Sequence, residues 1–208
     1  MVEESLTSDW PAALERGVAG RAMPGEYRSG DLAVFAAYAG GALVAVIDGL
    51  GHGDEAADAS EAAARVLREY RSAPVDELLR RCHETLRRTR GAVMTLAWFD
   101  LDRSQLAWAG VGNVEARLVR GAAVFGDRHD SALVLGGVIG YNLPKVVRPA
   151  VMELRQGDAV AFATDGIEAD YSTSLSPNVP AQELADRILK RHGKGNDDAL
   201  AVVVRYLG

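Results

Sequence analysis

The sequence contains a single cysteine, Cys82, among its 208 residues, and this scarcity excludes several kinds of chemistry. One cysteine can form neither an internal disulfide nor half of a thiolate zinc site, which agrees with a reducing compartment. Cys82 lies on the apolar stripe of a predicted helix, so we expect a small core residue and not a nucleophile.

The chain also has few of the features that mark membrane and nucleic-acid-binding proteins. No apolar run is long enough to cross a bilayer, and residues 1–5 include two acids where a signal peptide needs a basic stretch. We therefore expect a cytoplasmic protein with no membrane partner. The formal net charge is -6, whereas a nucleic-acid partner demands a clustered basic face. The composition therefore argues against a nucleic-acid partner.

Hydrophobic residues, in contrast, are abundant. They make up 48% of the chain, which is enough for a sizeable core. Length favours one domain over two, and neither a repeat nor a linker-like stretch divides the sequence. We predict a single domain over residues 1–208.

Hydrophobic periodicity predicts the order of strands and helices. The predicted strands cover 32–38, 42–47, 92–99, 105–110, 114–120, 146–154, 158–164 and 200–206. The predicted helices cover about 55–70, about 75–90 and 181–191. Two neighbouring helices between a hairpin and a meander favour antiparallel sheets covered by helices over a βαβ winding. The predicted fold class is α+β.

Acidic residues stand where several predicted strands begin or end. They are Asp31, Asp48 before Gly49, Asp165 before Gly166, and the pair Asp197 and Asp198. Strand ends can converge on one rim of a sheet, where carboxylates repel one another unless a cation neutralises them. Hard divalent ions prefer oxygen ligands, and a glycine lets a backbone carbonyl approach the ion. Asp-Gly is also a common turn dipeptide, so spacing alone leaves both interpretations open.

Five sequence blocks follow one another in an order found in a known family. They are residues 24–31, 46–53, 109–115, 163–167 and 195–199, and the second contains the pattern Asp-Gly-Leu-Gly-His-Gly. In these blocks the chain resembles the metal-dependent (type 2C, SpoIIE-like) serine/threonine protein phosphatases, from about Val18 to Tyr206. The combination carries the resemblance, because no block is specific alone.

The resemblance implies a four-layer αββα sandwich, with two antiparallel β-sheets flanked by helix pairs and two manganese or magnesium ions at one end. By position, Asp48 would bridge both ions and Gly49 would offer its carbonyl to one of them. Asp165 and Asp197 would complete the coordination of the other, and Asp31 would bind directly or hold a metal water. A bridging water would become the hydroxide that attacks phosphorus.

Some positions depart from the family pattern. His52 stands four residues after Asp48 and is a candidate catalytic proton donor, although between two glycines it could equally shape the turn or order water. The phosphate-clamping arginine of larger members has no clear equivalent, and Arg28 is the nearest candidate. Asp198 takes the place of an uncharged residue and is left out of the ligand set.

Other polar residues have no motif that assigns them a role. We expect His83, His129 and His192 at the surface, and Asn113 could close a turn or touch metal water or substrate. The segment from Asp170 to Pro180 is rich in serine, threonine and proline, so we expect a flexible loop at the rim of a protein-docking surface.

The resemblance implies a bacterial phosphatase that hydrolyses phosphoserine or phosphothreonine on phosphorylated STAS-domain proteins, such as those of the stressosome scaffold. Two other interpretations stay open. One is a noncatalytic binding module that docks a STAS or kinase partner, and the other is a metal hydrolase for small phosphomonoesters. The retained aspartates argue against the module, because an adaptor has no need to keep mutually repelling acids together.

Overall fold

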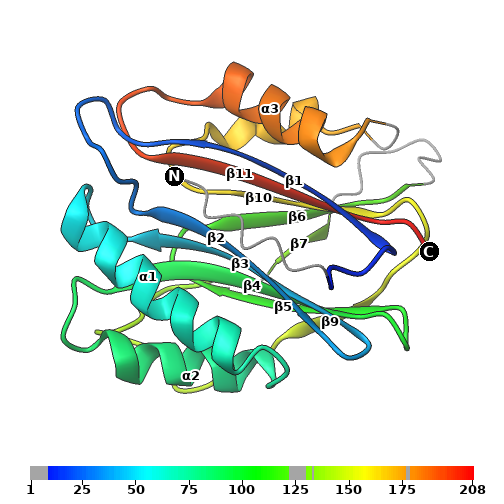
Figure 1. The fold of residues 1–208 in the computed structure, drawn as a ribbon, viewed down its shortest axis with the longest axis horizontal. Coiled ribbons are helices and arrows are strands. Elements are labelled where there is room, and N and C mark those ends of the chain that lie inside the picture. The colour runs from blue at the N-terminus through cyan, green and yellow to red at the C-terminus, as the bar shows by residue number, and fades with distance from the viewer. Residues whose placement is uncertain (1–8, 122–129, 133, 177–178) are drawn as a thin grey trace.

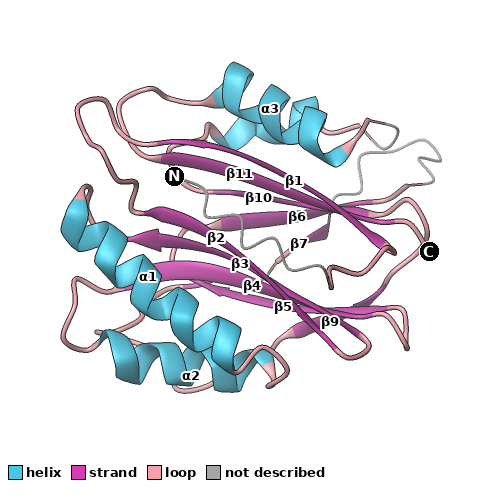
Figure 2. Cartoon of the chain, in the orientation of Figure 1, coloured by secondary structure: helices cyan, strands magenta, loops and turns pink. Residues whose placement is uncertain are grey.

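The computed structural model describes residues 9–121, 130–132, 134–176 and 179–208. Within these ranges the chain forms two β-sheets that pack face to face, with helices on both outer sides (Figure 1, Figure 2). The layers follow the order helix, sheet, sheet, helix. The predicted four-layer α+β sandwich is therefore confirmed.

One sheet has the strand order β1-β11-β10-β6-β7, and the pairs that the structure describes in it are antiparallel. Its strands are β1 (Leu14–Arg21), β6 (Glu115–Val119), β7 (Asp130–Ser131), β10 (Ala159–Ala163) and β11 (Ala199–Tyr206). Helix α3 (Ala181–His192) and the 3-10 helix η1 (Ala169–Ser174) cover its outer face, where the resemblance implied two α-helices.

The other sheet has the order β2-β3-β4-β5-β8, and β9 also pairs with β5. Its strands are β2 (Asp31–Tyr38), β3 (Gly41–Gly49), β4 (Ala92–Asp100), β5 (Gln105–Val111), β8 (Val134–Leu135) and β9 (Ala150–Glu153). Helices α1 (Asp54–Glu69) and α2 (Val75–Leu86) cover its outer face. The short strand β8 runs parallel to β5, which departs from the predicted antiparallel sheet.

Side-chain alternation along the strands builds one core between the sheets and one more under the helices on each outer face. In β3, Val44 and Val46 pack toward the sheet that contains β10 and β11, whereas Leu43, Ala45 and Ile47 pack against α1 and α2. All five side chains are fully buried, so both faces of β3 are apolar and the strand reads as one continuous apolar run.

Cys82 belongs to the core under α1 and α2 and is fully buried. Burial raises the pKa of its thiol to about 12, so the thiolate is scarce at neutral pH. The prediction of a small core residue is confirmed.

The prediction of a strand over 146–154 is wrong in its first half. Only Ala150–Glu153 forms a strand, paired with β5. Pro149 lacks the N–H that would extend the ladder, so the apolar residues before it stay outside the sheet.

The prediction of a flexible loop from Asp170 to Pro180 is wrong over residues 170–174. Residues Ala169–Ser174 form η1, in which Tyr171 and Ser174 are buried. The ring of Tyr171 lies 5.5 Å from the guanidinium of Arg117 in β6, and it packs in the core beneath α3. Residues 177–178 of the predicted loop lie outside the described residues.

Strand β1 was not predicted, because glycines and charges interrupt its apolar pattern. Gly17 is needed there, since a Cβ would lie 2.3 Å from the carbonyl carbon of Ala181 at the start of α3. The next helical residue, Gln182, reaches back to the strand edge. Its Oε1 accepts the N–H of Val18 at 3.0 Å, and its Nε2 donates to the carbonyl of Val18 at 2.8 Å.

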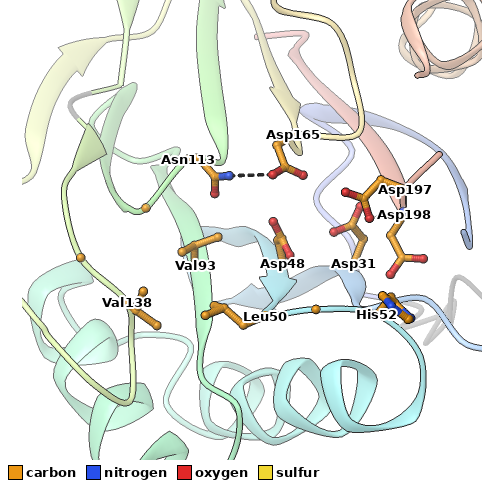
Figure 3. A pocket seen from close by; sticks show the side chains of 13 residues that line it. Asp31, Asp48, Leu50, His52, Val93, Asn113, Val138, Asp165, Asp197 and Asp198 are labelled. Carbon is orange, nitrogen blue, oxygen red and sulfur yellow. Dashed lines mark hydrogen bonds between the residues drawn. The ribbon is translucent and has the colours of Figure 1, made fainter. Parts of the chain in front are cut away.

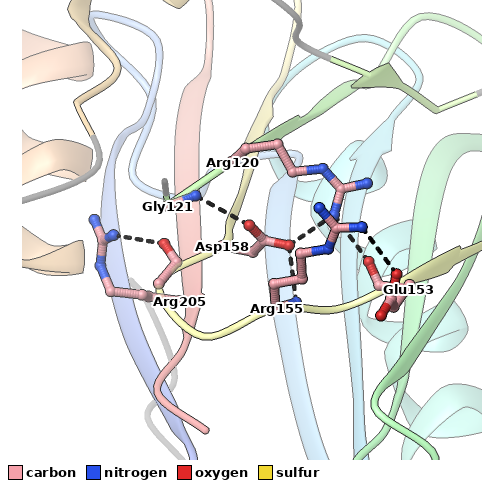
Figure 4. Close-up of polar contacts among 7 residues, drawn as sticks. Arg120, Gly121, Glu153, Arg155, Asp158 and Arg205 are labelled. Carbon is pink, nitrogen blue, oxygen red and sulfur yellow. Dashed lines mark hydrogen bonds and ion pairs between the residues drawn. The ribbon is translucent and has the colours of Figure 1, made fainter. Parts of the chain in front are cut away.

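A buried carboxylate joins the turns where β10 begins (Figure 4). Asp158 is 2% exposed and accepts hydrogen bonds from Nη1 of Arg120 at 2.7 Å and from the N–H groups of Gly121 and Arg155, both at 3.0 Å. These bonds tie the end of β6 to the turn before β10. The other end of β10 leads to Asp165, so Asp158 stabilises the fold far from the predicted metal site.

Among the described residues, no helix is both long and apolar enough to span a membrane.

Candidate metal centre

Two acids face each other across the hairpin of β2 and β3. Asp31 begins β2 and Asp48 lies near the end of β3, and the antiparallel register places them directly opposite one another. Like charges in this position destabilise a sheet. The fold therefore places two carboxylates together that need a neutralising partner.

The other sheet contributes further acids to the same place. Asp165 follows the end of β10, and Asp197 and Asp198 precede β11, its antiparallel neighbour. With Asp31 and Asp48, these residues line one pocket of about 440 Å³ (Figure 3). The structure thus brings together four of the five predicted metal ligands.

The pocket has an acidic side and an apolar side. Leu50, Val93 and Val138 line it across from the carboxylates (Figure 3). No Lys or Arg is among its described lining residues, and His52 is the only basic side chain there. In the described ranges, no three carboxylate, histidine or cysteine side chains lie close enough together to hold a metal ion as they stand. The acids line one pocket, but their carboxylate groups do not converge on a single point in it.

The electrostatics of the pocket favour a cation. Burial, followed by the charges of Asp165 and Asp197, raises the pKa of Asp48 to about 7. Burial and the charge of Asp48 raise the pKa of Asp31 well above its ordinary value. The pKa values rise because the carboxylates are buried next to one another and no neighbouring cation offsets either effect. A donor set of carboxylate oxygens suits Mg²⁺ or Mn²⁺, so the residues present fit such an ion.

Two neutral side chains orient the carboxylates. The hydroxyl of Thr164 donates to Oδ2 of Asp31 at 2.7 Å. Nδ2 of Asn113 donates to Oδ2 of Asp165 at 2.9 Å, as Figure 3 shows. Sequence reasoning left Asn113 undecided and missed Thr164. The available signal was its position, a hydroxyl directly before Asp165 at a strand end.

Asp198 also lines the pocket, but backbone groups occupy its oxygens. It is 4% exposed, and its two oxygens accept the N–H groups of Met23 and Gly30, each at 2.7 Å. These bonds hold the loop before β2 against the start of β11. This structural role agrees with leaving Asp198 out of the predicted ligand set.

Gly49 is not among the residues that line the pocket. A Cβ at this position would lie 2.1 Å from the carbonyl oxygen of Ala56, so only glycine lets α1 pack this close to β3. The structure gives Gly49 a packing role, and coordination by its carbonyl stays a prediction.

His52 lies at the mouth of the pocket, where its side chain is 52% exposed. Its Nδ1 lies 2.7 Å from Oε1 of Glu26, which holds the ring. The neighbouring Gly51 and Gly53 have φ angles of 91° and 71° and form the turn by themselves. This geometry weakens the turn-shaping interpretation, and proton donation by His52 stays a prediction.

Arg28 does not line the pocket. Its guanidinium bonds Asp58 at 2.8 Å and Glu61 at 2.7 Å, both on α1. These partners occupy it, so the structure offers no support for Arg28 as a phosphate clamp.

The surface prediction is wrong for His192, whose side chain is 10% exposed. His83 is half-buried, and its Nδ1 accepts the N–H of Gly140 at 3.0 Å. His129 lies outside the described residues.

Similarity to known proteins assigns the class to which this fold and pocket belong. Residues 38–207 match the family model of Stage II sporulation protein E (SpoIIE). The chain belongs to the SpoIIE family and is a metal-dependent protein-serine/threonine phosphatase.

Individual proteins of this kind are also similar to the chain. Phosphoserine phosphatase RsbX of Bacillus subtilis (strain 168) is 24% identical over 166 residues, which cover 79% of this chain and 80% of RsbX. The crystal structure of RsbX in complex with magnesium matches with a TM-score of 0.81 at 22% identity, covering 94% of this chain and 96% of that one.

A third match is a solved structure described as the bacterial stressosome, a modular system adapted to control secondary messenger signalling. It is 30% identical to this chain, with a TM-score of 0.84, and covers 92% of this chain and 99% of that one. These matches agree with the confirmed fold and the predicted family.

Proposed function

We propose that this phosphatase hydrolyses phosphoserine or phosphothreonine on phosphorylated STAS-domain proteins of a stressosome-type assembly. The observation that carries the proposal is the convergence of Asp31, Asp48, Asp165 and Asp197 on one pocket. The relationship to a phosphoserine phosphatase and to a chain of a stressosome structure supports the substrate class. We further propose that residues 1–208 act as one domain in the cytoplasm.

The acids of the pocket would hold two divalent ions. Asp31, Asp48, Asp165 and Asp197 would hold them through carboxylate oxygens, and Gly49 would add its carbonyl. Bound manganese or magnesium would supply the charge that neutralises the phosphoryl oxygens and acidifies the attacking water.

The chain's own residues orient these groups and shape the site. Thr164 and Asn113 each bond one oxygen of a carboxylate, which fixes the side chains of Asp31 and Asp165. His52 bonds Glu26 through Nδ1, so its Nε2 is the atom that would donate a proton to the departing serine or threonine oxygen.

The test is phosphate release from a phosphorylated STAS-domain protein with Mn²⁺ present. Asp48→Asn and Asp165→Asn should each remove nearly all activity, whereas Asp102→Asn, an exposed acid in the turn after β4, should leave it unchanged. Full activity in either pocket variant would overturn the proposal.

A calorimetric titration with Mn²⁺ and an aryl phosphate assay separate the other interpretations. A noncatalytic module would neither bind Mn²⁺ in a calorimetric titration nor hydrolyse a small aryl phosphate. A hydrolase for small phosphomonoesters would cleave the aryl phosphate and leave the phosphoprotein intact.

A further inference from the structure

A second cluster of polar side chains lies outside the pocket, where η1 meets the end of α3. His192 ends α3 and sits between two residues of η1. Its Nε2 lies 2.7 Å from Oγ of Ser174, and its Nδ1 lies 2.9 Å from Oδ1 of Asp170. The imidazole is nearly buried, whereas the side chain of Asp170 is 71% exposed.

The cluster is bonded in the order serine, histidine, aspartate, as in a serine hydrolase, but its serine is not accessible. A catalytic serine must be open to a substrate carbonyl. Ser174 is 6% exposed and faces the packed interior between η1 and α3, so no substrate reaches it. The bonds of His192 therefore hold η1 against α3.

The same junction joins the two loops that carry acids of the metal pocket. The carbonyl of His192 accepts the N–H of Glu168 at 2.7 Å, and the carbonyl of Gly166 accepts the N–H of Lys194 at 2.9 Å. A bridge between Ile167 and Gly193 lies between these bonds. The spacing between the two loops is therefore set at this junction.

The pocket acids lie a few residues beyond the junction. Asp165 directly precedes Gly166, and Asp197 follows Lys194 by three residues. The two loops are in close backbone contact, because a Cβ on Gly166 would lie 1.9 Å from the carbonyl oxygen of Asp198. A shift of η1 relative to α3 would move the two carboxylates relative to each other.

We propose that His192 is a positioning residue for the metal centre. By bonding Ser174 and Asp170, its side chain locks η1 to α3 and fixes the separation of Asp165 and Asp197 that a bound cation requires. The inference rests on the proposed function to the extent that these two acids are ligands. Removing an outer partner of a metal ligand weakens binding by about 10–100-fold. The imidazole of His192 acts on Asp165 and Asp197 only by holding η1 against α3, and the backbone bonds of the junction remain in its absence, so we expect the lower end, about tenfold.

The test is a calorimetric titration of the full chain with Mn²⁺. His192→Ala should weaken binding about tenfold. Asp170→Ala, an exposed change that spares the core, should also weaken it, while Asp170→Asn keeps an acceptor oxygen and should restore most of the affinity. Lys190→Ala, in the same turn of α3 and exposed, should bind as the unchanged protein does.

A second destabilising variant in α3 distinguishes a positioning role of His192 from a purely structural one. Ile188→Val removes one buried methylene from α3 and leaves His192 and its partners in place. With EDTA present, it should lower the melting temperature without changing Mn²⁺ affinity. Equal loss of affinity in Ile188→Val and His192→Ala would overturn the inference, as would unchanged affinity in His192→Ala.

Failure of the inference and failure of the proposed function give different results. If the unchanged protein binds Mn²⁺ but releases no phosphate from phosphoproteins, the function is wrong and the effect of His192→Ala on binding still decides the inference. If the unchanged protein binds no Mn²⁺, both are overturned.

Discussion

Replacing Asp48 by asparagine should stabilise the metal-free protein while it removes activity. In the folded chain the pKa of Asp48 is raised from 3.8 to about 7 by burial and by neighbouring acids. A raised carboxyl pKa means that the folded state binds the proton more tightly than the unfolded state does. The resulting penalty is absent below pH 4, grows as the pH rises toward 7, and is complete above it.

The size of the effect follows from the same values. The difference between 3.8 and about 7 corresponds to about 4 kcal/mol when each pH unit is worth about 1.36 kcal/mol. Because the neighbouring acids share this penalty and Asp48 is partly exposed, we expect about half, near 2 kcal/mol. For a chain of this length, that raises the melting temperature by about 4–8 °C.

The assay is thermal unfolding in EDTA at pH 8 and pH 5, with Asp102→Asn as the control. Asp48→Asn should melt above the unchanged protein at pH 8, and the difference should shrink at pH 5. Added Mn²⁺ should stabilise the unchanged protein and leave Asp48→Asn unaffected. A variant that melts below the unchanged protein at pH 8 in EDTA would refute the reasoning.

Two further predictions concern polar groups at either end of the sandwich. Asp158→Ala should lower the free energy of unfolding by about 3 kcal/mol, because Arg120 and two N–H groups lose their acceptor. Urea unfolding measures this loss, and a changed Mn²⁺ affinity would contradict a purely structural role. Thr164→Val should weaken Mn²⁺ binding about tenfold, because Asp31 loses the hydroxyl that orients it. Calorimetry checks this, and unchanged affinity would show that Asp31 needs no such partner.

Sequence reasoning succeeded where a strong periodic pattern met a strand end. The apolar run of β3 fixed the place of Asp48, and the hairpin register brought Asp31 opposite it. The convergence of Asp165 and Asp197 followed from two antiparallel neighbours, β10 and β11. Their assignment as metal ligands stays a prediction.

The failures have physical causes as well. The partners of His192 lie 18 and 22 residues away, so no local pattern indicates that it is buried. In η1, serine and threonine suggest a solvated loop, and one buried tyrosine reverses that expectation. Strand β1 was missed because glycines and charges interrupt its apolar pattern, and only the tertiary structure shows that Gly17 lets the predicted helix α3 pack on the strand.

The bonds between Gln182 and Val18 bear on how this molecule meets other chains. An exposed outer strand offers its N–H and C=O groups as a template for self-assembly. In β1 a glutamine amide already occupies both groups of Val18, much as a neighbouring peptide would. Another polypeptide would have to dislodge that amide before pairing with β1 at Val18, so the edge is blocked at this position against fibril-like growth and donated-strand association.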